Sequence, residues 1–148
     1  MARVTLEIPE SFVFSTDLEV RAGDLNYGAH VGNDRILSLM QEARIQFYRS
    51  IGIRSDMHLE GTVGHVISDA QVIYKAEAFL GDVIEIKVAY ANFSKNAFDM
   101  FFLMTNKESG KEIARCKTGL VCFDFEIRKV APIPASFKEK LERTSGSV

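Results

Sequence analysis

The segment that follows Gly32 is apolar around most of a helical wheel, and this constrains the fold more than any other feature of the chain. We predict a helix with Asn33 or Asp34 as its N-cap that runs to about Ser50, with Gly52 as its C-terminal stop. Its apolar residues recur at steps of three and four, with two more that widen the stripe: Ile36, Leu37, Met40, Ala43, Phe47 and Ile51, then Leu39 and Tyr48. A helix that is apolar on this many sides has to be covered from several directions.

Strands from the rest of the chain can supply that cover. Apolar or alternating segments bounded by turn residues predict five strands: Phe12–Val20, His65–Tyr74, Val83–Phe93, Ala97–Thr105 and Ile113–Phe125. Links of hairpin length between the later strands favour an antiparallel sheet. A short helix is predicted over Ala135–Arg143, after Pro132 and Pro134 end the sheet. The expected fold class is α+β, with a curved antiparallel β-sheet wrapped around one long central α-helix.

The size and composition of the chain fit one domain. It has 148 residues, of which 47% are apolar, so we expect a single domain over 1–148 with its core at about 11–134. A net charge of −2 argues against a nucleic-acid partner. The apolar runs are too short for a membrane span, and the N-terminus lacks the basic-then-apolar layout of a signal peptide.

Cysteine and histidine usage adds expectations about compartment and cofactors. Cys116 and Cys122 lie on one predicted strand, too far apart to bridge each other, and are expected to be reduced core thiols of a cytoplasmic protein. The three histidines, His30, His58 and His65, form no metal-ligand spacing. We therefore expect no metal and no cofactor.

The loop before the predicted helix is the strongest candidate for a functional site. Residues 21–32 are rich in Gly, Asn and His, and they run directly into the helix N-terminus. Such a junction points unpaired backbone N–H groups and a positive dipole end outward. N–H groups near Val31, Gly32 and Asn33 can therefore hold a polarised carbonyl, and Gly32 leaves room for a substrate to approach.

Several short motifs occur in a fixed order along the chain: Arg21, Asp24, His30, Val31, Asn33, Ala43-Arg44, Gly81-Asp82, Ala114, Val121–Asp124 and Ile133-Pro134. In order and spacing they resemble the hotdog-fold thioesterases, in the branch similar to 4-hydroxybenzoyl-CoA thioesterase. The resemblance extends from Phe12 to about Pro134. It implies an acyl-CoA substrate and a homodimer or homotetramer with the pocket at the subunit interface.

The chain departs from that family at both of its usual acids. The catalytic carboxylate of the loop is replaced by Asn26, and the acidic position of the helix is occupied by Gln41. An amide can orient a water molecule or the acyl carbonyl, but it cannot act as a general base. Glu42 is the next residue, about 100° around the helix from Gln41. Asp24 is the nearest carboxylate in the loop.

We take Asn26, His30, Glu42 and Asp24 as the catalytic candidates. The substrate-binding candidates are Tyr27, Val31, Gly32, Asn33, Gln41 and His65. Each has a purely structural alternative, such as an Asx-turn at Asn26, a loop tie at Asp24 or a surface charge at Glu42. Cations expected near the phosphates of coenzyme A are Arg21, Arg35, Arg54, Lys95 and Lys129.

Two functions stay open at this point. The first is an acyl-CoA thioesterase in which water attacks a thioester held at the helix N-terminus. The second is a catalytically weak acyl-CoA or fatty-acyl binding protein of the same fold, which the two amides favour. A dehydratase on this fold ranks below both, because the chain lacks the sequence signature of a histidine with an acid that such an enzyme is expected to carry.

Overall fold

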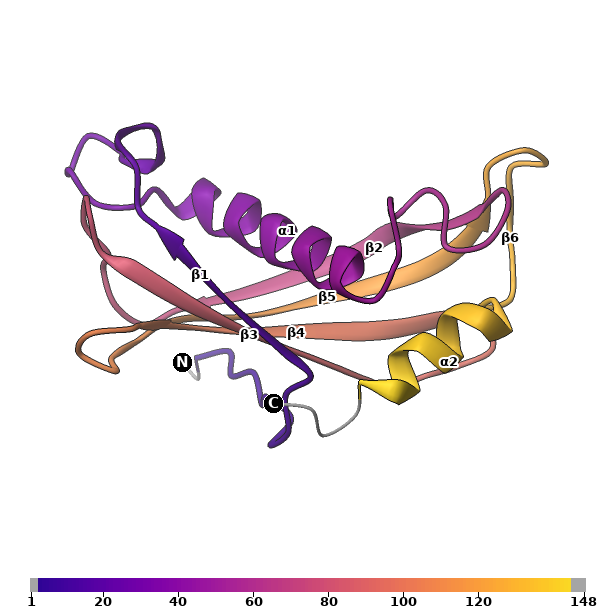
Figure 1. Ribbon diagram of the computed structural model, residues 1–148. Coiled ribbons are helices and arrows are strands. Elements are labelled where there is room, and N and C mark those ends of the chain that lie inside the picture. Colours follow the sequence, from indigo (N-terminus) through magenta and orange to yellow (C-terminus); the bar gives the residue numbers. More distant parts are fainter. Residues whose placement is uncertain (1–2, 145–148) are drawn as a thin grey trace.

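The computed structural model describes residues 3–144 and has an α+β architecture (Figure 1). The elements in chain order are β1 (Phe14–Glu19), the 3-10 turn η1 (Ala22–Asp24), α1 (Asn33–Ser50), β2 (Val63–Tyr74), β3 (Val83–Ala91), β4 (Ala97–Asn106), β5 (Glu112–Asp124), β6 (Lys129–Val130) and α2 (Ala135–Arg143). The five predicted strands and both helices are found. The turn η1 and the short strand β6 were not predicted.

The strands form one antiparallel sheet in the order β1-β3-β4-β5-β2, with β6 paired to β5. This confirms the predicted α+β class and the antiparallel sheet. Several predicted strand boundaries are off by one or two residues. The end of β3 is one of these: it lies at Ala91 rather than Phe93, because Asn92 takes a φ of 59° and turns the chain. β2 is an edge strand of the sheet. Its register against β5 shifts between Ile67 and Asp69.

Helix α1 lies along one face of the sheet (Figure 1). The largest fully buried side chains of the core come from α1, the sheet, α2 and the residue after β1: Phe47, Tyr48, Ile84, Ile86, Phe98, Met100, Phe102, Met104, Leu120, Phe137, Leu141 and Val20. Leu39 and Tyr48, which widen the apolar stripe in the sequence, are both buried. The N-cap is Gly32, not Asn33 or Asp34, and no side chain caps the helix.

Helix α2 is part of the same core. Phe137 is fully buried, and its ring contacts Tyr48 of α1 and Phe98 of β4. The hydroxyl of Tyr90 donates a hydrogen bond to the carbonyl of Leu141. The C-terminal helix therefore closes the end of the core at which α1 finishes.

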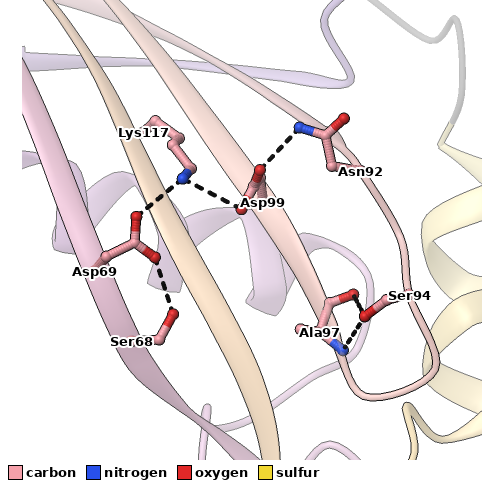
Figure 2. Close-up of polar contacts among 7 residues, drawn as sticks. All are labelled: Ser68, Asp69, Asn92, Ser94, Ala97, Asp99 and Lys117. Atoms are coloured by element: carbon pink, nitrogen blue, oxygen red, sulfur yellow. Dashed lines mark hydrogen bonds and ion pairs between the residues drawn. The ribbon is translucent and has the colours of Figure 1, made fainter.

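The other face of the sheet carries a polar cluster, seen in Figure 2 with α1 behind the sheet. Lys117 of β5 donates to Asp69 of β2 at 2.9 Å and lies 3.7 Å from Asp99 of β4, which accepts from Asn92 at 2.8 Å. The hydrogen bond from Lys117 lowers the pKa of Asp69. Gly119 makes room for this arrangement, because a Cβ atom there would lie 2.0 Å from Oδ1 of Asp69.

Both cysteines are free and buried, as predicted. Burial raises the pKa of the Cys116 thiol to about 12 and that of Cys122 to about 11, so both thiols stay protonated and unreactive near neutral pH. Within residues 3–144 there is no helix with the length and apolar character to span a bilayer.

Candidate active site

Main-chain hydrogen bonds give the loop before α1 its shape. Asn26 N–H donates to the His30 carbonyl at 2.9 Å, and Ala29, with a φ of 60°, turns the chain between them. Val31 N–H donates to the carbonyl of Ala78 at 2.8 Å. The loop is thereby fixed to the segment that precedes β3, so two parts of the chain far apart in sequence form one wall.

The first turn of α1 offers fewer free donors than the sequence suggests. Val31 N–H is bound to Ala78, and Gly32 N–H donates to the carbonyl of Asp24 at 3.0 Å. These two groups are therefore not available to a ligand, which corrects the expectation for them. Within the described chain, the N–H groups of Asn33 and Asp34 have no hydrogen-bond partner. They are the donors that the helix N-terminus presents.

A cavity of about 440 Å³ lies beside this helix end. Its lining combines the loop, α1, the end of β2 and the start of β5: Asn26, His30, Val31, Asn33, Ile36, Tyr74, Lys75, Ala76, Glu77, Ala78 and Ile113. The lining includes both polar and apolar side chains. Four of the predicted site residues, Asn26, His30, Val31 and Asn33, are brought together here.

Asn26 has both a structural role and a free donor. Its Oδ1 accepts a hydrogen bond from Gly28 N–H at 2.9 Å, which is the predicted Asx-turn. Because a backbone N–H requires an acceptor, this bond fixes which end of the amide is oxygen. The Nδ2 group has no partner among the described residues and is left to donate to a ligand.

His30 is held by its own backbone neighbour. Nδ1 donates to the carbonyl of Val31 at 3.2 Å, since a carbonyl can only accept. In the neutral ring, Nε2 therefore carries a lone pair. Nε2 lies 3.9 Å from Oε1 of Glu77.

The two loop and helix carboxylates proposed as catalytic lie elsewhere. Asp24 and Glu42 line a separate cavity of about 500 Å³ on the β1 side of α1. The Asp24 carboxylate accepts from Arg21 N–H at 2.9 Å, which ties the loop, and Glu42 accepts from Gln46 at 2.9 Å. Neither lines the cavity that contains Asn26 and His30: Glu42 is on the face of α1 toward β1, and Asp24 is held by Arg21.

The remaining predicted substrate-binding residues are dispersed. Tyr27 is fully exposed on the outside of the loop, and Gln41 is exposed on α1. Gly32 serves as the N-cap of α1. His65 is buried under the far end of α1, where its Nε2 is hydrogen-bonded to Tyr48 Oη at 2.7 Å.

Burial shifts the pKa values of His65 and Tyr48 at this end of α1. Burial, together with the charge of nearby Arg44, lowers the pKa of His65 to about 4, and Asp56 opposes this shift. Burial raises the pKa of Tyr48 well above its usual value. Arg44 is itself buried and donates to Asp56 at 3.3 Å. The cluster joins α1 to the loop that precedes β2.

Sequence reasoning missed Tyr74, Lys75 and Glu77. Tyr74 donates from its hydroxyl to the Asn33 carbonyl at 3.0 Å, and burial raises its pKa. Tyr74 ends a predicted strand and the other two follow it, a position that gives no local signal of function. Only the long-range pairing of the loop with residues 78–79 places them beside the helix N-terminus.

Comparison with known families gives a match over most of the chain. Residues 20–141 match the model of a family described as the thioesterase-like superfamily. The long-chain acyl-CoA thioesterase FadM of Escherichia coli is 24% identical over 132 residues, which cover 86% of this chain and 96% of that protein.

Solved structures share the fold at low sequence identity. A 1,4-dihydroxy-2-naphthoyl-CoA thioesterase from Synechocystis superimposes with a TM-score of 0.79 at 22% identity, over 86% of this chain and 94% of that chain. A hypothetical protein from Staphylococcus aureus, solved in complex with CoA, gives a TM-score of 0.81 at 14% identity, over 95% of this chain and 87% of that chain.

Proposed function

Because the chain belongs to the thioesterase-like superfamily, with the hotdog fold, we propose that it is an acyl-CoA thioesterase that works at the N-terminus of α1. One observation carries the proposal. The cavity of about 440 Å³ combines free hydrogen-bond donors at a helix N-terminus with an apolar wall. A thioester needs both, because its carbonyl is polar and its acyl group is apolar.

The polar wall is suited to the carbonyl oxygen. Hydrolysis builds negative charge on this oxygen, and preorganised donors stabilise that charge. Asn26 Nδ2 and the N–H group of Asn33 are the donors, and the helix dipole adds to them. In this proposal the amide at position 26 polarises the thioester rather than abstracting a proton.

The apolar wall would receive the acyl group. Ile36, Ala76, Ala78 and Ile113 line it, and the alanines leave space that larger side chains would fill. CoA thioesters are the proposed substrates because two of the similar proteins are named as acyl-CoA and naphthoyl-CoA thioesterases, and a third was solved with CoA.

A second copy of the chain would complete the site. The edge strand β2 exposes apolar side chains, among them Val66, Ile67 and Tyr74. An exposed apolar sheet edge favours association with another strand. We therefore propose a homodimer or homotetramer, with Gln41 on the exposed part of α1 facing the subunit contact. We place the protein in the cytoplasm on the strength of its reduced buried thiols.

The direct test is thiol release by the purified protein from short-chain, long-chain and aromatic acyl-CoAs. We expect hydrolysis of at least one class, with competition by a non-hydrolysable thioether analogue. Absence of thiol release across the whole panel would overturn the proposal.

The second candidate function is a catalytically weak acyl-CoA or fatty-acyl binding protein. The amides at Asn26 and Gln41, in place of the family's two acids, favour it. Substitution N26D separates the two candidates. A large gain in hydrolysis would indicate a degenerate enzyme, whereas loss of a measurable wild-type rate would indicate that the amide itself is used.

A further inference from the structure

The cavity at the α1 N-terminus contains one carboxylate, and it comes from neither the loop nor the helix. Glu77 lies in the segment between β2 and β3, and among the described lining residues it is the only acid. Lys75 is the other charged side chain of the lining, and Tyr74 is a further titratable one. The chain has amides, Asn26 and Gln41, where the family usually carries acids, but Glu77 supplies a carboxylate from the segment between β2 and β3.

Glu77 and His30 are brought together by main-chain pairing. Val31 N–H donates to the Ala78 carbonyl at 2.8 Å, and His30 pairs with Phe79 in an antiparallel bridge. As a result, Nε2 of His30 lies 3.9 Å from Oε1 of Glu77. The position of the two side chains therefore depends on the backbone of both segments.

The geometry leaves a place for water between the two side chains. A separation of 3.9 Å is too long for a direct hydrogen bond. Both atoms are acceptors when the ring is neutral, because Nδ1 of His30 carries the proton that Val31 accepts. One water molecule can donate to both acceptors at this spacing.

We propose, on the basis of the thioesterase function above, that His30 is the general base and that Glu77 is its positioning residue. Glu77 accepts a hydrogen bond from the water and so orients it toward Nε2 of His30, which takes the water proton during attack. The Glu77 side chain is 62% exposed, so solvent competes for its hydrogen bond to the water and its effect is smaller than that of His30 itself.

The reaction balances as follows. The water oxygen forms a bond to the thioester carbonyl carbon, and one water proton passes to Nε2 of His30. The oxyanion accepts hydrogen bonds from Asn26 Nδ2 and from the N–H group of Asn33. Collapse breaks the C–S bond, and His30 returns the proton to the thiolate sulfur. The products are a carboxylic acid, which ionises, and the CoA thiol.

The test compares H30Q, E77Q and E77D with the wild type in steady-state hydrolysis of the best acyl-CoA substrate, as a function of pH. Glu126 in the turn after β5 is exposed, so E126Q is the matched control for loss of one surface carboxylate. Binding of a thioether analogue and circular dichroism are measured on every variant.

We expect H30Q to lower kcat by about 10² to 10⁴-fold and to abolish the fall in kcat at acidic pH. E77Q should lower kcat by about tenfold or more with little change in KM, and E77D should recover part of the loss. E126Q and analogue binding should be unchanged.

Two results would overturn the pairing of His30 and Glu77 while leaving the proposed function standing. One is an active wild type whose E77Q variant keeps kcat within twofold. The other is an H30Q variant with an unchanged pH profile. A wild type that releases no thiol from any acyl-CoA would instead overturn the proposed function, and the pairing with it.

Discussion

Gly28 lies so close to His30 that no side chain fits between them: a Cβ atom at position 28 would stand 2.9 Å from Nε2 of the ring and 3.3 Å from Oδ1 of Asn26. Contacts this short force the neighbouring side chain to move. The two polar side chains of the proposed site can therefore approach each other only across a glycine.

Substitution G28A should accordingly displace His30 and lower kcat by about tenfold or more, since small misplacements of catalytic groups are costly. Gly23 is a matched control, because a Cβ atom there would meet nothing within 4 Å. Thiol-release kinetics on G28A and G23A check this. Equal rates in the two variants would show that the position of His30 does not matter.

Acid should destabilise the chain through His65. Its pKa in the fold is about 4, below the ordinary 6.5, so between these pH values the folded state binds fewer protons than the unfolded state. The free energy of unfolding should fall as the pH drops through this window, with a slope of at most about 1.4 kcal/mol per pH unit. Urea unfolding at several pH values measures it.

The slope should be reduced in H65Q and retained in H58Q, because His58 is exposed whereas His65 is buried against Tyr48. Identical slopes in wild type and H65Q would assign the acid sensitivity to other groups.

Removing the Phe137 ring should test whether α2 belongs to the core. This ring is fully buried between Tyr48 and Phe98. F137A should lower the free energy of unfolding by about 3–5 kcal/mol. The control E139A removes an exposed side chain of the same helix and should change stability by less than about 0.5 kcal/mol. Denaturant titration of both variants measures these changes. A loss in F137A as small as that in E139A would show that α2 is not part of the core.

The polar cluster of Figure 2 should contribute a salt-dependent part of the stability. Lys117 contacts both Asp69 and Asp99. K117A should cost about 1 kcal/mol at low ionic strength and less at 1 M salt, since screening weakens partly exposed ion pairs. Chemical unfolding of wild type and K117A at the two salt concentrations measures the difference. A loss that does not depend on salt would indicate packing by the lysine stem instead.

The sequence was sufficient for most of the fold because its signals are periodic and local. The apolar stripe of α1 and the alternation along β3 each depend on neighbours within a few positions. The predicted end of β3 was wrong because Asn92 adopts a left-handed conformation that the pattern of side chains does not encode. The N-cap was misassigned because Gly32 takes that position without a capping side chain.

The site was predictable only where it is local. Asn26 and His30 lie in one short loop, so sequence alone placed them near the helix N-terminus. Glu77 reaches the same cavity through pairing between segments almost fifty positions apart, and no short-range pattern contains that contact. The direction of Glu42 was equally out of reach, because it depends on how α1 is rotated against β1.

The loop at the head of α1 owes its shape to peptide groups rather than to side chains: Asn26 N–H to the His30 carbonyl, and Val31 N–H to the Ala78 carbonyl. Any amino acid other than proline can supply such bonds. A loop held in this way can keep its shape when the side chains on it are exchanged, so an acid and an amide can occupy position 26 on the same backbone. Proteins that share this loop backbone can therefore carry different reactive side chains on it.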